Sequence, residues 1–164
     1  MYNNKKPGTD LNKCFSCALK FLSIRDYGEK ELLAKLKQKG FSKENSETAI
    51  KKCIEYKYLD DKKYALRLFQ YEKNKLNGSF KIKYTMLSKK LDEELVDEII
   101  SRYEGSPEEY DTAKKYLEKI LYRIGKKNTR QKKYAAFIQS LNNKGFSKDI
   151  IMKLTDEYSH LFSC

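Results

Sequence analysis

The sequence LKQKGFS at residues 36–42 has a close counterpart, LNNKGFS, at residues 141–147. In both places a stretch of helix-forming residues reaches Lys-Gly, and Phe-Ser follows. A glycine just after a helix takes the left-handed conformation, which would cost a residue with a Cβ roughly 1–2 kcal/mol. The phenylalanine can fold back onto the last helical turn, and the serine can cap the next helix. The motif therefore predicts a tight corner between two helices, and its recurrence predicts a repeated unit.

Helical periodicity extends outward from these corners over nearly the whole chain. Apolar residues recur at spacings of three and four, and Gly, Asn-Gly and Ser-Pro signals separate the periodic segments. This pattern predicts an all-α fold of nine helices, as three tandem three-helix repeats forming an elongated, curved helical array. We expect the repeats at residues 10–57, 58–105 and 106–164. A flexible N-terminal arm would occupy residues 1–9, with Asp10 as the cap of the first helix.

The middle unit departs from the corner pattern. Aligning the ends of the second helices places Leu36, Leu87 and Leu141 in register. In this alignment the corner becomes Lys90-Leu91-Asp92, with Leu91 at the position of the glycine. We therefore expect the middle helix to end in a different way or its corner to be strained.

The composition is that of a basic globular protein. The 164 residues include 35 basic and 23 acidic ones, for a net charge of +12, which is typical of nucleic-acid binders. Only five of the basic residues are arginine, and an A/T-rich genome also produces this bias toward lysine, so charge alone leaves nucleic-acid binding open. No apolar run approaches the ~20 residues that span a bilayer, and the first ten residues do not resemble a signal peptide. We expect a cytoplasmic monomer without a membrane partner.

The cysteines allow a metal interpretation, which we consider the weaker one. Cys14 and Cys17 have the spacing of zinc ligands, but Cys53 and Cys164 stand alone and the single histidine is His160. A structural zinc site needs a second pair of ligands. Both cysteines of the pair also fall on the apolar face of a predicted helix, where free cysteine packs as a small hydrophobic residue. We expect buried thiols, with no metal and no cofactor.

Three segments of the chain have a distinctive order and spacing. The first carries Leu22-Ser23-Ile24-Arg25-Asp26-Tyr27-Gly28-Glu29-Lys30-Glu31-Leu32, then Leu36 and Lys39-Gly40-Phe41. The second carries Tyr58-Leu59-Asp60-Asp61, Tyr64-Ala65 and Gly78, and the third Leu141 and Lys144-Gly145-Phe146. Over roughly residues 14–158 this succession resembles the tandem repeats of the RecX family of recombinase regulators. Leu91 and a short N-terminal arm depart from the family pattern.

The resemblance implies a regulatory protein without enzymatic activity. RecX proteins bind the RecA filament assembled on DNA, lie in its helical groove, and restrain filament growth and RecA's ATPase, strand-exchange and coprotease activities. The resemblance thus implies a role in DNA repair, recombination and the SOS response, with RecA as partner and weak, sequence-independent DNA binding. The matching motif residues are expected to be structural: Arg25, Asp26, Tyr27, Gly40, Phe41, Asp60, Asp61, Gly145 and Phe146. For Arg25, Asp26, Asp60 and Asp61 we expect helix capping or buried ion pairs.

Basic residues concentrate on the second helix of each unit. We expect stacked repeats to align these helices into one basic stripe, suited to DNA phosphates or to an acidic protein surface. The candidate contacts are Lys35, Lys37, Lys39, Lys81, Lys83, Lys89, Lys90, Lys126, Lys127, Arg130, Lys132 and Lys133. Interleaved aromatic residues could stack on bases, but their helical spacing favours core packing: Phe80, Tyr84, Tyr134 and Phe137.

Two other functions remain open. The chain could be a stand-alone DNA-binding protein, such as a transcription regulator that uses a second and third helix as a helix-turn-helix. A nuclease is disfavoured, because metal-assisted chemistry needs several converging ligands and the sequence offers only Asp60-Asp61 and one terminal histidine.

Overall fold

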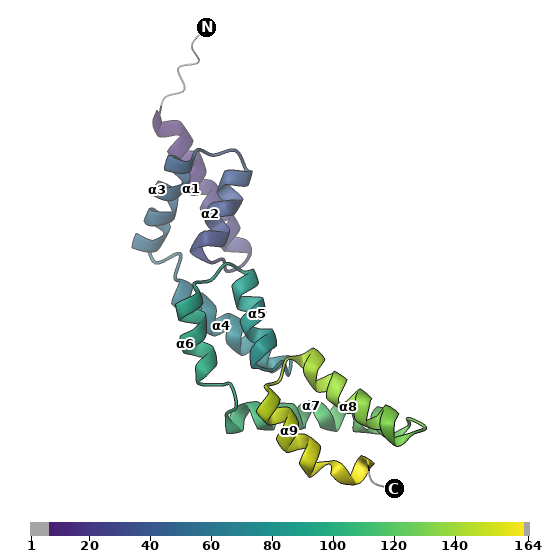
Figure 1. The fold of residues 1–164 in the computed structure, drawn as a ribbon. Coiled ribbons are helices and arrows are strands. Elements are labelled where there is room, and N and C mark those ends of the chain that lie inside the picture. Colours follow the sequence, from purple (N-terminus) through teal and green to yellow (C-terminus); the bar gives the residue numbers. More distant parts are fainter. Residues whose placement is uncertain (1–6, 163–164) are drawn as a thin grey trace. The chain divides into compact units, whose positions relative to one another are not determined.

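The computed structural model describes residues 7–162, and no strand forms within them (Figure 1). The helices are α1 (Pro7–Ile24), α2 (Glu29–Gln38), α3 (Lys43–Glu55), α4 (Asp61–Asn74), α5 (Ser79–Ser88), α6 (Glu93–Ser101), α7 (Pro107–Gly125), α8 (Arg130–Lys144) and α9 (Lys148–Glu157), followed by the 3₁₀ helix η1 (Ser159–Phe162). The prediction of an all-α fold is confirmed. None of these helices is both long enough and apolar enough to cross a lipid bilayer.

Helix α1 begins earlier than predicted. It starts at Pro7, and proline is favoured at a first helical position because its missing N–H would have had no partner there. Asp10 therefore lies inside the first turn of α1 rather than at its cap. A carboxylate in the first turn still interacts favourably with the positive end of the helix dipole. Residues 1–6 of the predicted arm lie outside the described residues.

The chain divides into two compact units. The first runs to Arg67 and includes Leu87–Leu95, and the second comprises Leu68–Met86 and resumes at Val96. Helices α1, α2 and α3 belong to the first unit, and α7, α8 and α9 to the second. The predicted repeat boundaries fall between helices, before α4 and before α7.

The core of the first unit forms where α1 packs on α3 and α2. Its fully buried residues have the spacing of amphipathic helix faces: Cys14, Ala18, Leu32, Leu36, Ala49 and Cys53. Burial raises the pKa of the Cys53 thiol to about 11 and also raises the pKa of Cys14. These thiols are therefore protonated at neutral pH and pack as apolar groups. Across residues 7–162 no cluster of three or more His, Cys, Asp or Glu side chains is placed to hold a metal ion.

The core of the second unit lies among α7, α8 and α9. Leu117, Phe137, Leu141, Ile150 and Leu154 are fully buried in it, and η1 adds Phe162. The ring of Phe162 meets Phe137 edge-on at a centroid distance of 5.3 Å. The 3₁₀ turn after α9 thereby closes the end of this core.

The two Lys-Gly-Phe-Ser corners have the predicted geometry. Gly40 and Gly145 are left-handed, with φ of 89° and 72°. In each corner the phenylalanine amide donates to the leucine carbonyl five residues earlier, at 3.3 Å, as in a Schellman cap. Phe146 is buried and Phe41 packs against the first core. The glycine turns the chain, and the phenylalanine fixes the turn to the core.

The middle corner corrects the sequence alignment by one residue. Lys90, not Leu91, occupies the position of the glycine, and it is left-handed with φ of 61°. Leu91 is buried and takes the place of the phenylalanine, while Asp92 caps α6 by accepting the Glu94 amide at 3.1 Å. The fully buried residue equivalent to Leu36 and Leu141 is therefore Met86 rather than Leu87. The alignment was wrong because two apolar residues, Met86 and Leu87, are adjacent at this point. The corner keeps the left-handed turn, with the Lys90 amide donating to the Leu87 carbonyl at 2.8 Å, and its strain lies at Lys90.

This geometry predicts that Lys90→Gly stabilises the protein. Relief of the left-handed Cβ strain, roughly 1–2 kcal/mol, exceeds the roughly 0.4–1 kcal/mol that a glycine adds to the entropy of the unfolded chain. We expect a net gain of roughly 0.5–1 kcal/mol in the free energy of unfolding, measured by urea titration. The neighbouring Lys89→Gly, where φ is negative, is the control and should destabilise. Equal losses in both variants would show that Lys90 is not strained.

Candidate functional site

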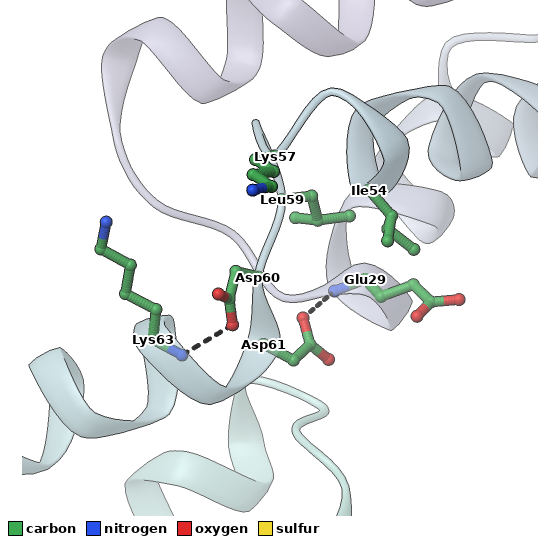
Figure 2. Close-up of a pocket in the computed structure, with 7 residues that line it drawn as sticks. All are labelled: Glu29, Ile54, Lys57, Leu59, Asp60, Asp61 and Lys63. Atoms are coloured by element: carbon green, nitrogen blue, oxygen red, sulfur yellow. Dashed lines mark hydrogen bonds between the residues drawn. The ribbon is translucent and has the colours of Figure 1, made fainter.

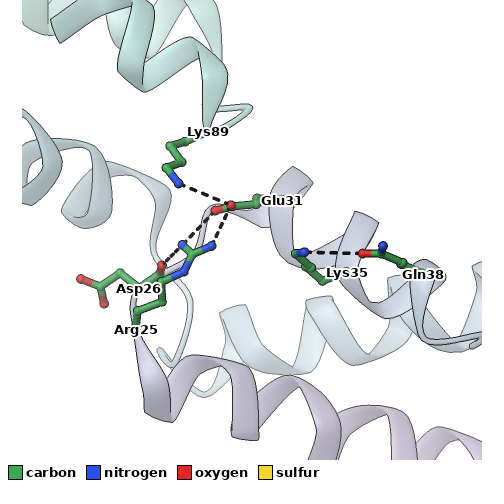
Figure 3. Close-up of polar contacts among 6 residues, drawn as sticks. All are labelled: Arg25, Asp26, Glu31, Lys35, Gln38 and Lys89. Carbon is green, nitrogen blue, oxygen red and sulfur yellow. Dashed lines mark hydrogen bonds and ion pairs between the residues drawn. The ribbon is translucent and has the colours of Figure 1, made fainter.

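Residues of the first family-like motif form ion pairs around the α1–α2 connection. The Arg25 guanidinium donates to both carboxylate oxygens of Glu31, at 2.8 and 3.2 Å, and lies 3.6 Å from the centroid of the Tyr27 ring. Lys89 approaches the same carboxylate at 3.9 Å (Figure 3). Asp26 instead pairs with Arg67 at 3.1 Å. Arg25 and Asp26 thus fix the connection through separate partners on other helices.

Asp60 and Asp61 serve different helices. Asp60 caps its own helix α4 by accepting the Lys63 amide at 2.9 Å, as predicted for a carboxylate at a helix start. Asp61 instead accepts the backbone amide of Glu29, the first residue of α2, at 2.8 Å (Figure 2). Burial raises the pKa of Asp61, and the hydrogen bond from Glu29 opposes that shift. Asp61 therefore caps the second helix of the preceding repeat, a role that the sequence analysis did not foresee.

These aspartates also line a pocket within the first unit. It measures about 540 Å³ and is bordered by Glu29, Ile54, Lys57, Leu59, Asp60, Asp61 and Lys63 (Figure 2). One oxygen of each aspartate, Oδ1, accepts a backbone amide at a helix end. The pocket therefore gives no support to metal-assisted chemistry at Asp60-Asp61.

Glu109 performs the corresponding task in the second unit. It is fully buried and accepts four hydrogen bonds: from the Ser79 amide at 2.8 Å, the Gly105 amide at 2.7 Å, and the amide and hydroxyl of Ser147 at 3.3 and 3.1 Å. Ser79 is the first residue of α5, so the first helix of the third repeat caps the second helix of the middle repeat. One carboxylate thus joins α5, α7 and the α8–α9 corner.

The predicted capping of α9 by the Ser147 side chain is wrong, and the role of Glu109 was not predicted from the sequence. Ser147 precedes α9 as predicted, but its side chain does not cap that helix; it donates to Glu109. The available signal was the capping-box sequence Ser106-Pro107-Glu108-Glu109, in which the glutamate normally returns to the N-cap amide. Here Ser106 caps α7 alone, accepting the Glu109 amide at 3.1 Å, and the Glu109 carboxylate is free to reach other elements.

The predicted basic residues divide between the two units. In the first unit, Lys37 and Lys39 are exposed at the end of α2, and Lys90 is exposed at the middle corner. Lys35 is half-buried beside Gln38. Lys89 takes part in the Glu31 network, so its charge is partly neutralised. Lys37, Lys39 and Lys90 are therefore the best placed of these for an external anion.

The remaining predicted contacts lie in the second unit. Lys83 forms an ion pair with Asp97 at 2.6 Å, and Lys81 donates to the Asn143 carbonyl at 3.3 Å. The others surround the α7–α8 connection, where Lys126 lies 4.4 Å above the ring of the exposed Tyr122. That group comprises Lys126, Lys127, Arg130 and Lys132, which are exposed, and Lys133, which is half-buried. It is the most accessible of the predicted basic groups in this unit.

The structure shows a second basic group, centred on a corner lysine that was not among the predicted contacts. Lys144, the last residue of α8, is half-buried, and its ammonium donates to the Lys75 carbonyl at 2.8 Å and to Asn77 Oδ1 at 3.3 Å. Its pKa is lowered, first by burial and then by the neighbouring charge of Lys81, with smaller contributions from Lys119 and Lys75. Positive charge is therefore concentrated where α4, α5 and α8 meet.

The prediction of core packing for the four aromatic residues is right only for Phe137. That ring is fully buried, whereas Phe80, Tyr84 and Tyr134 are 51%, 75% and 47% exposed. Helical spacing cannot distinguish a core face from a second, exposed apolar face on the same helix. Phe80 and Tyr84 lie one turn apart on α5 and leave aromatic surface beside the basic residues of that helix.

Comparisons with known proteins identify the family. A family model described as "RecX, first three-helix domain" matches residues 14–53. A "Regulatory protein RecX" from Vibrio vulnificus is 32% identical over 148 residues, which cover 90% of this chain and 94% of that relative. The chain belongs to the RecX family. A RecX protein from Chlorobium phaeobacteroides is 29% identical over 150 residues, covering 91% of this chain and 95% of its own.

Solved RecX structures have the same fold. The crystal structure of RecX from Lactobacillus salivarius aligns with a TM-score of 0.82 at 26% identity, covering 93% of this chain and 99% of that one. A second crystal structure, of a regulatory protein RecX, aligns with a TM-score of 0.75 and covers 90% of this chain. The helical repeat array deduced from the corners is therefore the RecX fold.

The joint at Glu109 makes a sharp prediction about stability. In Glu109→Gln, an amide group faces donors that the carboxylate had accepted, and buried N–H groups lose their partner. We expect the free energy of unfolding to fall by at least about 2 kcal/mol. The neighbouring Glu108 is 59% exposed and pairs with Lys73, so Glu108→Gln should change stability by less than roughly 1 kcal/mol. Urea titrations of both variants measure the difference, and equal small effects would contradict the role assigned to Glu109.

Proposed function

We propose that this RecX-family protein binds the RecA filament on DNA and restrains RecA's ATPase, strand-exchange and coprotease activities. The observation that carries the proposal is membership of the RecX family over nearly the whole chain. The names of the relatives describe regulatory proteins rather than enzymes. The protein would act by binding, without catalysis or a cofactor, as a cytoplasmic monomer.

The distribution of charge supports a polyanionic or acidic target. Each unit has exposed lysines on or next to the second helix of a repeat. In the first unit they lie at the end of α2, and in the second unit around the α7–α8 connection. Lysines of this kind bind DNA phosphates with release of counterions and without sequence selectivity. Affinity would come from several modest contacts acting together, because the lysines belong to one covalent chain. The predicted basic residues are the proposed contacts with RecA and DNA.

The family-motif residues act differently in this proposal. Arg25, Asp26, Asp60 and Asp61 are engaged with other residues of the chain through ion pairs and helix caps. Gly40 and Gly145 turn the chain at corners. These residues would hold the repeats in shape, while the exposed lysines make the contacts.

RecA-dependent ATP hydrolysis on single-stranded DNA tests the proposal. We expect the protein to inhibit hydrolysis at stoichiometry with RecA, and the triple variant Lys126→Glu/Lys127→Glu/Arg130→Glu to need about tenfold more protein for equal inhibition. Two or three lost charge contacts of roughly 0.5–1 kcal/mol each account for that factor. The triple variant Lys13→Glu/Lys51→Glu/Lys153→Glu changes the net charge equally at exposed positions elsewhere and should inhibit normally. Unchanged hydrolysis with the unmodified protein would refute the proposal.

Binding to DNA without RecA separates the proposal from a helix-turn-helix regulator. We expect binding to two unrelated duplexes to be weak, equal and strongly weakened by salt. Tight binding to one duplex alone, persisting at high salt, would favour the stand-alone regulator.

A further inference from the structure

The Lys144 ammonium lies in an unusual environment for a charged group. It is half-buried, two of its N–H groups donate to the Lys75 carbonyl and Asn77 Oδ1, and it lies 5.1 Å from the centroid of the Tyr116 ring. These partners are neutral. Within residues 7–162, no carboxylate forms an ion pair with Lys144, Lys81 or Lys119. The positive charge at this point is therefore not neutralised by a direct partner.

Neighbouring lysines increase the positive potential at Lys144. Lys81 donates to the carbonyl of Asn143, the residue before Lys144, at 3.3 Å, and Lys119 lies one helical turn after Tyr116 on α7, whose ring Lys144 contacts. Burial lowers the pKa of Lys144, the charges of Lys81, Lys119 and Lys75 lower it further, and Glu72 opposes them. Glu72 is itself buried and already bonded to Lys75 at 2.8 Å and to the Asn77 side-chain amide at 2.7 Å. Lys75, Lys81 and Lys119 are exposed, but Lys144 is half-buried, so repulsion at its ammonium is screened less than in water.

A purely structural role explains only part of this arrangement. Lys144 satisfies a carbonyl near the C-terminal end of α4, where a cation is favoured. The backbone around it is close-packed, because the Gly78 amide donates to the Lys144 carbonyl at 2.8 Å and the Phe80 amide to the Gly145 carbonyl at 2.9 Å. Capping does not require Lys81 and Lys119, whose charges oppose the ionised Lys144. A bound anion would remove that repulsion.

We propose that Lys81, Lys119 and Lys144 form a binding site for a phosphate group, and that occupation of this site stabilises the joint between the α4–α5 turn and the α8–α9 corner. Phosphate oxygens accept charge-assisted hydrogen bonds from several ammonium groups at once. The site is distinct from the exposed group around the α7–α8 connection and does not require RecA. Its failure and that of the proposed function are therefore separate results.

Two sources could supply the phosphate. One is a small phosphate or diphosphate compound, and the other is the backbone of a nucleic-acid strand. Tyr84 is 75% exposed and lies one helical turn from Lys81 on α5, where its ring could stack on a base of a bound strand. Stacking would add affinity only for the nucleic acid, so the two sources can be distinguished by replacing Tyr84.

Thermal unfolding of the full chain tests the site. At constant ionic strength set with sodium chloride, saturating pyrophosphate or a short oligothymidylate should raise Tm by roughly 2–6 °C. Lys81→Gln/Lys119→Gln should abolish the shift with both ligands. Neither side chain is buried, so this variant should fold. Lys51→Gln/Lys153→Gln removes the same charge from exposed positions elsewhere and should keep the full shift.

Each outcome decides the proposal. A shift with both ligands, lost in Lys81→Gln/Lys119→Gln, supports a general phosphate site. A shift with the oligonucleotide alone that Tyr84→Ala reduces, and that the lysine variant abolishes, supports the same site with a nucleic-acid strand as its ligand. No shift with either ligand, or an equal shift in the lysine variant, overturns the proposal. The side-chain amide resonances of Asn77, which contacts Lys144, should move on binding in the supporting cases.

Discussion

A carboxylate supplied by one repeat to the second helix of the repeat before it is the interaction on which this structure depends. Asp61 accepts the first amide of α2, and Glu109 accepts the first amide of α5. The first amides of a helix have no partner within the helix, and the positive end of its dipole favours a negative charge. Gly28 precedes α2 and Gly78 precedes α5, so neither helix has a capping side chain just before it. The cap must come from elsewhere in the chain.

Close packing at the glycine before α5 explains why the cap of this helix comes from a distant carboxylate. A Cβ at Gly78 would collide with the backbone of Gly145 and Phe146 at 2.4 Å, whereas one at Gly28 would only reach ordinary contact with Leu91, at 3.4 Å. Before α5, a serine or aspartate that could cap the helix locally therefore has no room, and close packing itself creates the need for a carboxylate from the next repeat. The second helix of the third repeat, α8, follows a different rule: Thr129 precedes it and caps it by accepting the Lys132 amide at 3.2 Å.

The sequence predicted the features that depend on local chemistry and missed those that depend on contacts between repeats. The corners at Gly40 and Gly145, the order of the helices and the buried Cys14 follow from capping signals and periodicity. The middle register was wrong by one residue, because a lysine in the left-handed conformation leaves no sequence signal. The roles of Asp61, Glu109 and Ser147 join residues at least 30 positions apart, and no local rule assigns such partners.

The candidate site shows the same division between local and distant features. Lysine clusters are visible in the sequence, and the group around the α7–α8 connection is accessible in the structure. The sequence could not distinguish the neutralised Lys83 from the exposed Lys126, because the difference lies in Asp97 on another helix. It also could not show that Lys144, at a corner, donates to the Lys75 carbonyl and to Asn77, which lie 69 and 67 residues earlier in the chain. The corners and caps fix the repeats, and the lysines around them form the surface proposed for RecA and DNA.

Backbone hydrogen exchange followed by NMR tests the capping between repeats most directly. In the unmodified protein, the Glu29 amide should exchange at least about tenfold more slowly than the amide of Lys43, which is also the first residue of its helix. In Asp61→Ala, exchange at Glu29 should rise to the rate of Lys43, while the Ser79 amide, held by Glu109, should keep its protection. A Glu29 amide that exchanges as fast as that of Lys43 in the unmodified protein, or that does not respond to Asp61→Ala, would contradict this account.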